Sequence, residues 1–423
     1  MKKVSKERVG RFLKNHLGSK VGFALLCGFL FFCACAGRKT SEPPLAAPPS
    51  LNSLLLKSLW SKKMRGAISG LSISATGNAL VVATSPDPDI ENSAKHYLLS
   101  RWDSAGRLVW EFPVQFPVRD QDLSEDGALL VVSNYENQIL GFNSQGKVLW
   151  KVEGTCRPHI LHSQRILCYH DDDAEPGIAF DIFDGSGKKL QSFPISGDVL
   201  GLKISEDEAH LALALTGGHL LLLQMDSQGM WQKSWQKRVD GEVIDLAVSS
   251  GNATQVAALF RDADKKQKIG ILNADGNPLG EVVPSFLVTQ LEMEASGNFL
   301  FYTGTSALGQ YVGSAEARSS KESWRRGVAM GSEYSASIAL SKGPASSNSG
   351  NSVWAWFGFE ERVPEGRQSR LIALDQGGQE RARLELYSDE ESDLYLHKVA
   401  SRSSLIVVST DDARISLFSY DSK

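Results

Sequence analysis

The chain has 423 residues, with 45 Lys or Arg and 49 Asp or Glu, and a formal net charge of -4. Residues 1–34 contain seven basic residues and one Glu, so the remainder has 38 basic and 48 acidic residues and a net charge near -10. Binding to nucleic-acid phosphates requires a basic surface, and this composition therefore argues against a nucleic-acid partner.

Residues 1–34 have the pattern of an export signal. Basic residues crowd the first 20 positions, and an apolar run of twelve follows at 21–32. Twelve residues are few for a membrane span but usual for the core of a signal peptide. The sequence Phe32-Cys33-Ala34-Cys35 resembles a bacterial lipobox, although Phe32 and Cys33 depart from its usual residues. That resemblance implies cleavage before Cys35 and lipidation of Cys35. The alternatives are an uncleaved anchor or an ordinary secretory signal, and both also predict export.

Residues 35–52 are rich in Pro, Ala and Ser and predict a flexible tether to a folded domain at 53–423. No Asp follows Cys35, which resembles outer-membrane sorting in enteric-type bacteria. We therefore expect a protein of the bacterial cell envelope, lipid-anchored, most simply in the outer membrane facing the periplasm.

The folded region repeats one unit, seen whole at 118–154. It has four short apolar or alternating segments separated by turns, which is the pattern of a four-stranded antiparallel sheet. The turn before the fourth segment has an Asp or Asn, two small or polar residues and a Gly that can adopt a positive φ. This turn recurs at Asp103–Gly106, Asn143–Gly146, Asp184–Gly187, Asp226–Gly229, Asn273–Gly276 and Asp375–Gly378.

First-strand starts recur near Gly70, Arg119, Pro158, Leu200, Val243, Val288, Tyr334 and Leu394, which makes eight units of about forty to sixty residues. We therefore predict an all-β fold, an eight-bladed β-propeller with four antiparallel strands per blade. The eighth unit ends after three strands, and the segment 55–63 matches a fourth strand, with Trp60 in the register of Trp150. We expect this N-terminal strand to complete the last blade. The alternative is an open or seven-bladed ring.

Two cysteines, Cys156 and Cys168, lie in the folded region and flank the first hairpin of the third blade. Counting from a turn near Ser163 and Gln164 places them about three residues from direct opposition. A disulfide is possible in an oxidising compartment, and two separate packed thiols are the alternative.

Candidate catalytic or metal-binding residues are few. His159, His162 and His170 lie close in sequence, and Asp171, Asp172 and Asp173 follow. Residues three apart on a strand point to opposite faces, so we expect His159 and His162 to diverge and predict no metal site. The sequence contains neither a metalloprotease motif nor a serine-nucleophile elbow, and we predict no catalytic residue.

Tryptophans at repeated positions, such as Trp110, Trp150 and Trp324, predict packing between blades. Trp231, Trp235, Trp354 and Trp356 lie partly outside this register. Trp354 and Trp356 share one face of a predicted strand and are the one aromatic pair that we consider for a binding role.

The Asp-x-x-Gly turn followed by Trp resembles the repeat of PQQ-like propellers, and Leu-Ser-x-Asp-Gly at Leu123–Gly127 resembles WD40-like repeats. The quinone enzymes of the first group have an adjacent cysteine pair that this folded region lacks, so we expect no cofactor. In its layout of signal, anchor and eight blades, the chain is similar to the propeller lipoprotein of the outer-membrane β-barrel assembly machine. That similarity implies a non-catalytic protein-interaction scaffold, and no partner-binding residues are transferred from it.

Elaborated loops are expected where strand two joins strand three and strand four joins the next blade. These loops lie at 84–96, 171–177, 261–268, 360–370, 388–393 and 411–412. Loops on a rigid scaffold often bind partners. The candidate partner-binding residues are acidic: Asp87, Asp89, Glu91, Asp171, Asp172, Asp173, Asp389, Glu390, Glu391, Asp393, Asp411 and Asp412.

Three functional classes fit these observations. The first is a scaffold whose acidic loops bind a protein partner in the envelope, and the loops could equally serve solubility alone. The second is an exported metal-dependent hydrolase or lactonase that uses the central channel. The third is a structural envelope protein that associates with itself. We favour the scaffold.

Overall fold

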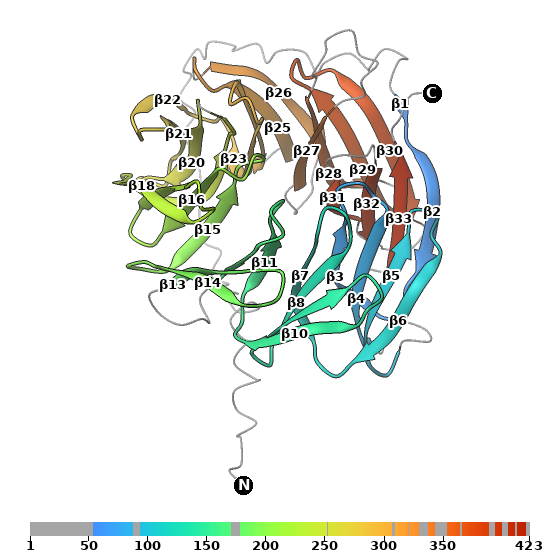
Figure 1. The fold of residues 1–423 in the computed structure, drawn as a ribbon. Helices are drawn as coiled ribbons and strands as arrows, with labels where there is room; N and C mark the ends of the chain where they lie inside the picture. Colours follow the sequence, from blue (N-terminus) through green and yellow to red (C-terminus); the bar gives the residue numbers. More distant parts are fainter. Residues whose placement is uncertain are drawn as a thin grey trace, which may run out of the picture. The chain divides into compact units, whose positions relative to one another are not determined.

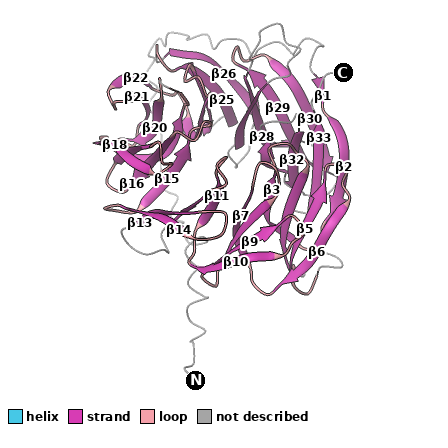
Figure 2. Ribbon diagram, in the orientation of Figure 1, coloured by secondary structure: helices cyan, strands magenta, loops and turns pink. Residues whose placement is uncertain are grey.

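The computed structural model describes residues 54–87, 94–170, 178–251, 253–306, 309–319, 321–329, 337–342, 353–363, 366–388, 394–399, 405–410 and 413–419. Residues 1–45 and 46–423 are separate compact units, and every described residue belongs to the second. The described residues form strands, turns and loops and no helix (Figure 2). These ranges therefore hold no apolar helix long enough to cross a membrane.

The second unit is an eight-bladed β-propeller whose sheets follow one another around a ring (Figure 1). Blade 1 has β3 (Ala67–Ile73), β4 (Ala79–Ser85), β5 (Tyr97–Asp103) and β6 (Leu108–Val114); blade 2 has β7 (Val118–Leu123), β8 (Leu129–Asn134), β9 (Gln138–Asn143) and β10 (Val148–Glu153). Blade 3 has β11 (Arg157–Ile160), β12 (Ile166–Tyr169), β13 (Ile178–Phe183) and β14 (Lys189–Pro194); blade 4 has β15 (Val199–Ile204), β16 (His210–Leu215), β17 (His219–Met225) and β18 (Trp231–Arg238).

Blade 5 has β19 (Glu242–Val248), β20 (Gln255–Arg261), β21 (Gln267–Asn273) and β22 (Pro278–Val282); blade 6 has β23 (Leu287–Met293), β24 (Phe299–Ser306), β25 (Gly309–Glu316) and β26 (Lys321–Ala329). Blade 7 has β27 (Ser337–Lys342), β28 (Val353–Val363), β29 (Gly366–Asp375) and β30 (Glu380–Ser388). Blade 8 has β31 (Leu394–Val399), β32 (Leu405–Thr410) and β33 (Arg414–Ser419), with β2 (Lys57–Lys63) as its fourth strand. The predicted fold is confirmed.

The first strand of each blade lies toward the centre of the ring and the fourth at the rim; we call them the inner and outer strands. Most successive inner strands contact each other, including β31 with β3 across the closure. Middle strands such as β8, with the sequence LLVVSN, are buried along their whole length because neighbouring blades cover both faces. The core is thus a series of apolar layers between blades, and the ring depends on its closure.

The N-terminal strand closes the ring. β2 pairs antiparallel with β33, with Trp60 opposite Leu417 and Ser61 opposite Ser416. The hydroxyls of Ser61 and Ser416 are 2.9 Å apart. β1 (Leu54–Leu55) pairs in parallel with β30 of blade 7. The predicted closure of the last blade by the N-terminal strand is confirmed, and the open or seven-bladed alternative is wrong.

All six predicted Asp/Asn-x-x-Gly sequences form the turn between the third and fourth strands. In the first of them the Gly106 N–H donates to the Asp103 carbonyl at 2.9 Å, while Asp103 Oδ1 accepts the N–H groups of Ala105 and Arg107. The six turn glycines have φ between 71° and 82°. The side-chain cap and the glycine together explain why the same sequence pattern recurs at this turn.

A tryptophan docks onto this turn at five of the seams between blades. The indole N–H donates to a turn carbonyl of the next blade at 2.8–3.1 Å, as follows: Trp60 to Ser104, Trp110 to Ser144, Trp150 to Gly185, Trp235 to Ala274, and Trp324 to Gln376. The predicted packing of tryptophans between blades is confirmed. Trp235 lies two residues farther from its turn glycine than Trp110 and Trp150 lie from theirs. Residues two apart on a strand share a face, so Trp235 docks in the same way.

Trp354 and Trp356 do not form an exposed binding surface. Trp354 is 4% exposed and Trp356 is fully buried. The indole N–H of Trp356 donates to Ser341 Oγ at 2.8 Å, and both rings pack in the core between blades 7 and 8. The binding role considered for this pair is therefore wrong, because β28 is a middle strand covered on both faces.

Candidate functional site

Polar side chains occupy one repeated position on the inner strands, two residues before the turn that leads to the second strand. This position holds Ser72, Asp122, His159, Lys203 and Glu292 in blades 1, 2, 3, 4 and 6. In blade 5 it holds Ala247, and Asp245 lies two residues earlier on the same strand. We call Asp122, His159, Lys203, Asp245 and Glu292 the central cluster.

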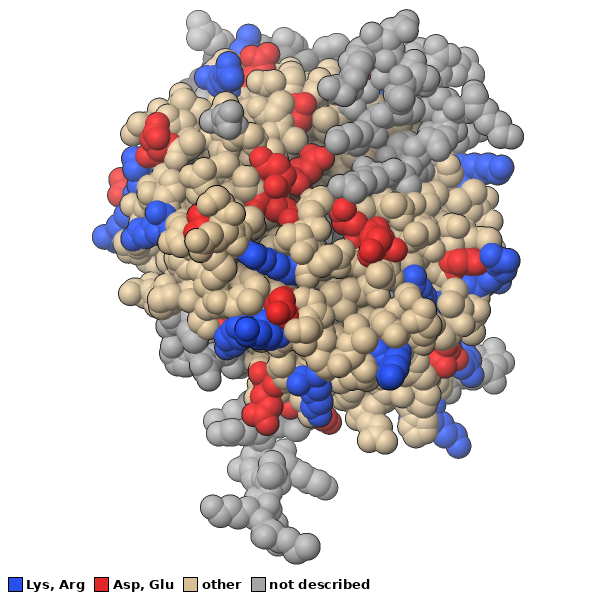
Figure 3. Space-filling model, viewed as in Figure 1, with Lys and Arg blue, Asp and Glu red and all other residues tan. Residues whose placement is uncertain are grey.

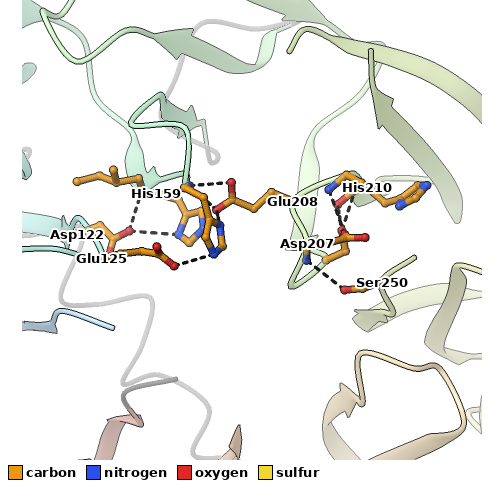
Figure 4. Close-up of polar contacts among 11 residues, drawn as sticks. Asp122, Glu125, His159, Asp207, Glu208, His210 and Ser250 are labelled. Atoms are coloured by element: carbon orange, nitrogen blue, oxygen red, sulfur yellow. Dashed lines mark hydrogen bonds and ion pairs between the residues drawn. The ribbon is translucent and has the colours of Figure 1, made fainter. Parts of the chain in front are cut away.

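Asp122 connects blades 2 and 3 at the ring centre. Its Oδ2 accepts the N–H of Ile160 at 2.9 Å and lies 3.2 Å from His159 Nδ1. Asp122 is 5% exposed, so burial of its charge requires such partners. Figure 4 shows this carboxylate directed at His159. The contact fixes one inner strand against the next.

Lys203 and Glu292 form an ion pair between blades 4 and 6, with 2.7 Å between Nζ and Oε1. Asp245 of the intervening blade 5 accepts the N–H of Leu291 at 2.7 Å. Burial raises the pKa of Glu292 and also that of Asp245, and the charge of Lys203 offsets only part of the effect. Burial alone would lower the pKa of Lys203, but Glu292 and Asp245 outweigh it and raise that pKa. One cation therefore serves two carboxylates in this part of the cluster.

His162 connects the first turns of three blades. Its Nε2 lies 2.7 Å from Glu125 Oε1 of blade 2, and its Nδ1 contacts Glu208 Oε1 of blade 4. Both carboxylate oxygens of Glu208 also accept the N–H of His162, at 2.8 and 2.7 Å. Both ring nitrogens of His162 therefore contact carboxylates of neighbouring blades.

The interlocking of first turns continues into blades 5 and 6. The Asp207 N–H donates to Ser250 Oγ at 3.1 Å (Figure 4). Asp207 Oδ2 also accepts the N–H of Gly251 at 2.7 Å. The Ser250 N–H donates to the Ala295 carbonyl at 2.8 Å. The first turns of blades 2 to 6 are thus connected to one another in sequence around the ring.

The predicted divergence of His159 and His162 is wrong. β11 ends at Ile160, so the alternation of a strand does not extend to His162, and both histidines contact carboxylates of blade 2. His170 lies apart from them, with Nε2 3.3 Å from Asp181 Oδ2 and Nδ1 3.0 Å from the Thr155 carbonyl. Among the described residues, no group of three or more His, Cys, Asp or Glu side chains is arranged to hold a metal ion.

Most of the predicted acidic partner-binding residues lie outside the described residues: Asp89, Glu91, Asp171, Asp172, Asp173, Asp389, Glu390, Glu391, Asp393, Asp411 and Asp412. Cys35, the predicted lipidation site, also lies outside them. Asp87 is described and is half-buried after β4. The partner-binding role of the acidic loops therefore stays a prediction.

Two of the expected elaborated loops are ordered hairpins. Between β20 and β21 the chain makes a tight turn in which the Lys265 N–H donates to the Asp262 carbonyl at 3.0 Å. In blade 7 the ladder between β28 and β29 continues to the pair Val363 and Gly366. The elaborated loops expected at 261–268 and 360–370 are hairpins in the described residues, because polar composition does not distinguish a loop from an exposed hairpin.

Cys156 and Cys168 are bonded to each other, with an S–S distance of 2.10 Å and a Cα–Cα distance of 5.2 Å. Arg157 pairs with Tyr169 in the ladder, so continuing the register places Cys156 two positions from opposition to Cys168, and not three. Residues two positions apart share a face, which brings the sulfurs within reach. The bond lies in the apolar layer between blades 2 and 3.

Sequence reasoning missed the central cluster. Lys203, Asp245 and Glu292 lie in three separate strands, and Lys203 and Glu292 are 89 positions apart. The signal that could have found Lys203 and Glu292 is a charged residue at the same offset before the turn in several repeats, where an apolar residue would be expected. On the face seen in Figure 3, Asp and Glu side chains gather near the middle, while most Lys and Arg lie toward the periphery.

No family model matches the sequence, and no curated protein matches it. Solved structures do. Sqt1 from Chaetomium thermophilum is 14% identical with a TM-score of 0.61, and the match covers 88% of this chain and 99% of that one. BamB from Moraxella catarrhalis is 11% identical with a TM-score of 0.52, covering 87% and 98%. The Dos1 propeller is 10% identical with a TM-score of 0.58, covering 86% and 96%. The chain therefore shares the propeller fold of BamB, a propeller lipoprotein, and of WD40-like propellers.

Proposed function

We propose that the protein is a non-catalytic scaffold of the bacterial cell envelope, anchored through a lipid on Cys35, that binds protein partners and serves outer-membrane protein assembly. The main support is the mutual pairing of the polar groups at the ring centre. Lys203 is engaged by Glu292, and His162 is engaged by Glu125 and Glu208. Groups paired in this way stabilise the ring and are not available to act on a substrate.

Similar propellers bind proteins. Sqt1 has been crystallised with the N-terminus of a ribosomal protein. A fold does not fix a function, so this likeness supports protein binding only as a class. We assign partner recognition to the acidic loops, which the sequence predicts at the end of the ring opposite the first turns.

Cross-linking in intact cells followed by mass spectrometry tests the scaffold role. We expect reproducible cross-links from the acidic loops to a small set of envelope proteins. A variant with Asp389, Glu390, Glu391 and Asp393 changed to Lys should lose those partners on co-purification. The matched control reverses two exposed acidic residues at the turns between third and fourth strands, Asp275→Lys and Glu316→Lys, and should retain those partners. Equal partner recovery from both variants would contradict the assignment of the loops.

The anchor and the absence of catalysis have separate tests. Cys35→Ser should move the protein from the membrane fraction to the soluble fraction, and unchanged membrane association would contradict lipid anchoring.

The alternative function is a metal-dependent hydrolase or lactonase. Stoichiometric metal in the purified protein, removed by chelators together with a hydrolytic activity, would replace the scaffold proposal with that one.

A further inference from the structure

Every outer strand of the propeller has a β-bulge at the same place. The pairing with the third strand shifts register just before the docking tryptophan or the residue at its position, and one residue is left out of the ladder. In the order of blades 8, 1, 2, 3, 4, 5, 6 and 7, the residues left out are Leu59, Val109, Leu149, Leu190, Ser234, Leu279, Ser323 and Arg381. A bulge turns its residue away from regular pairing, and seven of these eight residues are exposed at the rim, whereas Leu190 is half-buried against the core of blades 3 and 4.

The residues displayed by these bulges differ around the ring. Blades 8, 1 and 2 are consecutive and display five aliphatic side chains that are 41–54% exposed: Leu59, Leu108, Val109, Val148 and Leu149. In blades 4, 6 and 7 the same two positions are polar, as with Ser234 and Ser323. The backbone is the same, so folding does not require aliphatic residues at this place. We call these five side chains the aliphatic rim.

The aliphatic rim is continuous because tryptophan docking joins its blades. Trp60 follows Leu59 and donates to Ser104, in the turn that leads to Leu108. Trp110 follows Val109 and donates to Ser144, in the turn that leads to Val148. Exposed aliphatic positions therefore succeed one another along the outside of three adjoining blades (β2, β6 and β10 in Figure 1).

Basic residues accompany the aliphatic rim in a chain that is acidic overall. The exposed Lys and Arg residues on these outer strands and the turns before them are Lys57, Lys62, Lys63, Arg107, Lys147 and Lys151. The acidic residues there are Asp103, which pairs with Arg107, Glu111, which pairs with Arg65, and Glu153. Aliphatic side chains among Lys and Arg are the combination that binds the interface of an anionic membrane.

We propose that the aliphatic rim and its lysines lie against an anionic lipid bilayer. The rim is the convex outside of the ring and suits a deformable surface. A bulge in every outer strand interrupts the regular edge that an added strand would need. The chain also enters the propeller here, since β2, the outer strand of blade 8, comes before every other strand of that blade in the sequence, and the apolar run 21–32 precedes it. This contact is a second membrane attachment, separate from lipidation of Cys35.

Vesicle flotation tests this contact without the anchor. A chain of residues 46–423 retains every described strand and lacks Cys35. We expect it to float with vesicles of phosphatidylglycerol and phosphatidylethanolamine, to stay unbound with phosphatidylcholine alone, and to dissociate at high salt. The rim variant combines Leu59→Ser, Val109→Ser and Leu149→Ser. Serine is the residue that blades 4 and 6 already have at this bulge, so folding should be preserved.

A matched control removes three exposed leucines elsewhere: Leu200→Ser, Leu279→Ser and Leu287→Ser, which are 46%, 40% and 48% exposed. We expect the rim variant to partition about tenfold or more weakly onto anionic vesicles, because burial of aliphatic groups drives interfacial binding, and the control to partition like the parent. Failure of the parent to bind anionic vesicles would overturn the proposal. So would equal binding by both variants, or a rim-dependent dimer in sedimentation that shows no vesicle binding.

Discussion

Lys203 on β15 and Glu292 on β23 form an ion pair, 2.7 Å between Nζ and Oε1, across the inner strand of blade 5. Lys203→Met leaves Glu292 and Asp245 without their shared cation. Both side chains of the pair are about one-third exposed, so we expect a loss of about 1–3 kcal/mol in the free energy of unfolding, between the values for exposed and buried pairs. Urea unfolding at neutral pH measures this loss.

The loss from Lys203→Met should depend on pH. The pKa values of Asp245 and Glu292 are raised in the folded protein, so their contribution favours folding at low pH and is lost as the pH rises through their folded pKa values. Without Lys203 those pKa values rise further. The deficit should therefore be larger at pH 8 than at pH 5, and a deficit that is constant with pH would contradict the charge explanation. Lys203→Met with Glu292→Leu should recover part of the stability.

Asp181 on β13 is a second buried carboxylate, with the opposite shift. Burial alone would raise its pKa, but hydrogen bonds from His170, Lys189 and Ser192 outweigh burial and lower the pKa from 3.8 to about 2. Its stabilising contribution is thus present above pH 3.8 and is lost as the pH falls toward 2. We expect Asp181→Asn to lower the free energy of unfolding by about 2 kcal/mol at neutral pH. The free energy of unfolding of this variant should also fall less steeply than that of the parent as the pH is lowered in the acid range.

Chemical denaturation between pH 2 and 7 checks the Asp181 prediction, and the exposed Asp264→Asn is the control. The control should keep the stability and the acid limb of the parent. An Asp181→Asn protein that loses stability in acid as steeply as the parent would show that other carboxylates govern acid unfolding.

The fold could be predicted because its signals are local. The cap of Asp103 and the positive φ of Gly106 lie within one turn, and that turn recurs along the chain. The closure by β2 could be predicted because Trp60 has the sequence register of Trp150. In each case a few neighbouring residues determine the structure, and repetition multiplies the signal.

The centre of the ring could not be predicted in the same way. The distance between Lys203 and Glu292 depends on the radius of the ring, which no local pattern records. His162 was placed on a strand because the end of β11 at Ile160 has no strong breaker. The apolar bulge residues, such as Val109, are one position from the docking tryptophan, and sequence alone gives no reason to expose them.

Tryptophan docking predicts which glycines resist substitution. At Gly187, with φ 82°, an added Cβ would lie 2.6 Å from Trp150 Cδ2. At Gly251, with φ 79°, an added Cβ would meet nothing within 4 Å. Both alanine variants bear the strain of a positive φ, about 1 kcal/mol, but only Gly187→Ala also displaces an indole. We expect Gly187→Ala to cost at least about 1 kcal/mol more than Gly251→Ala in thermal unfolding. Equal costs would mean that the docked indole moves freely.

Closure of the ring by its N-terminal strand predicts a stabilising cross-link. Ser61 on β2 and Ser416 on β33 are register partners whose hydroxyls are 2.9 Å apart. The double variant Ser61→Cys with Ser416→Cys should form a disulfide that holds the last blade closed and restricts the unfolded chain. We expect a gain of about 2–4 kcal/mol in the free energy of unfolding, reversed by dithiothreitol. The pair Ser61→Cys with Ser419→Cys, which is three ladder positions out of register and on opposite faces, is the control and should not cross-link. Efficient cross-linking of the control, or none of the register pair, would contradict the pairing of β2 with β33 and with it the closed ring.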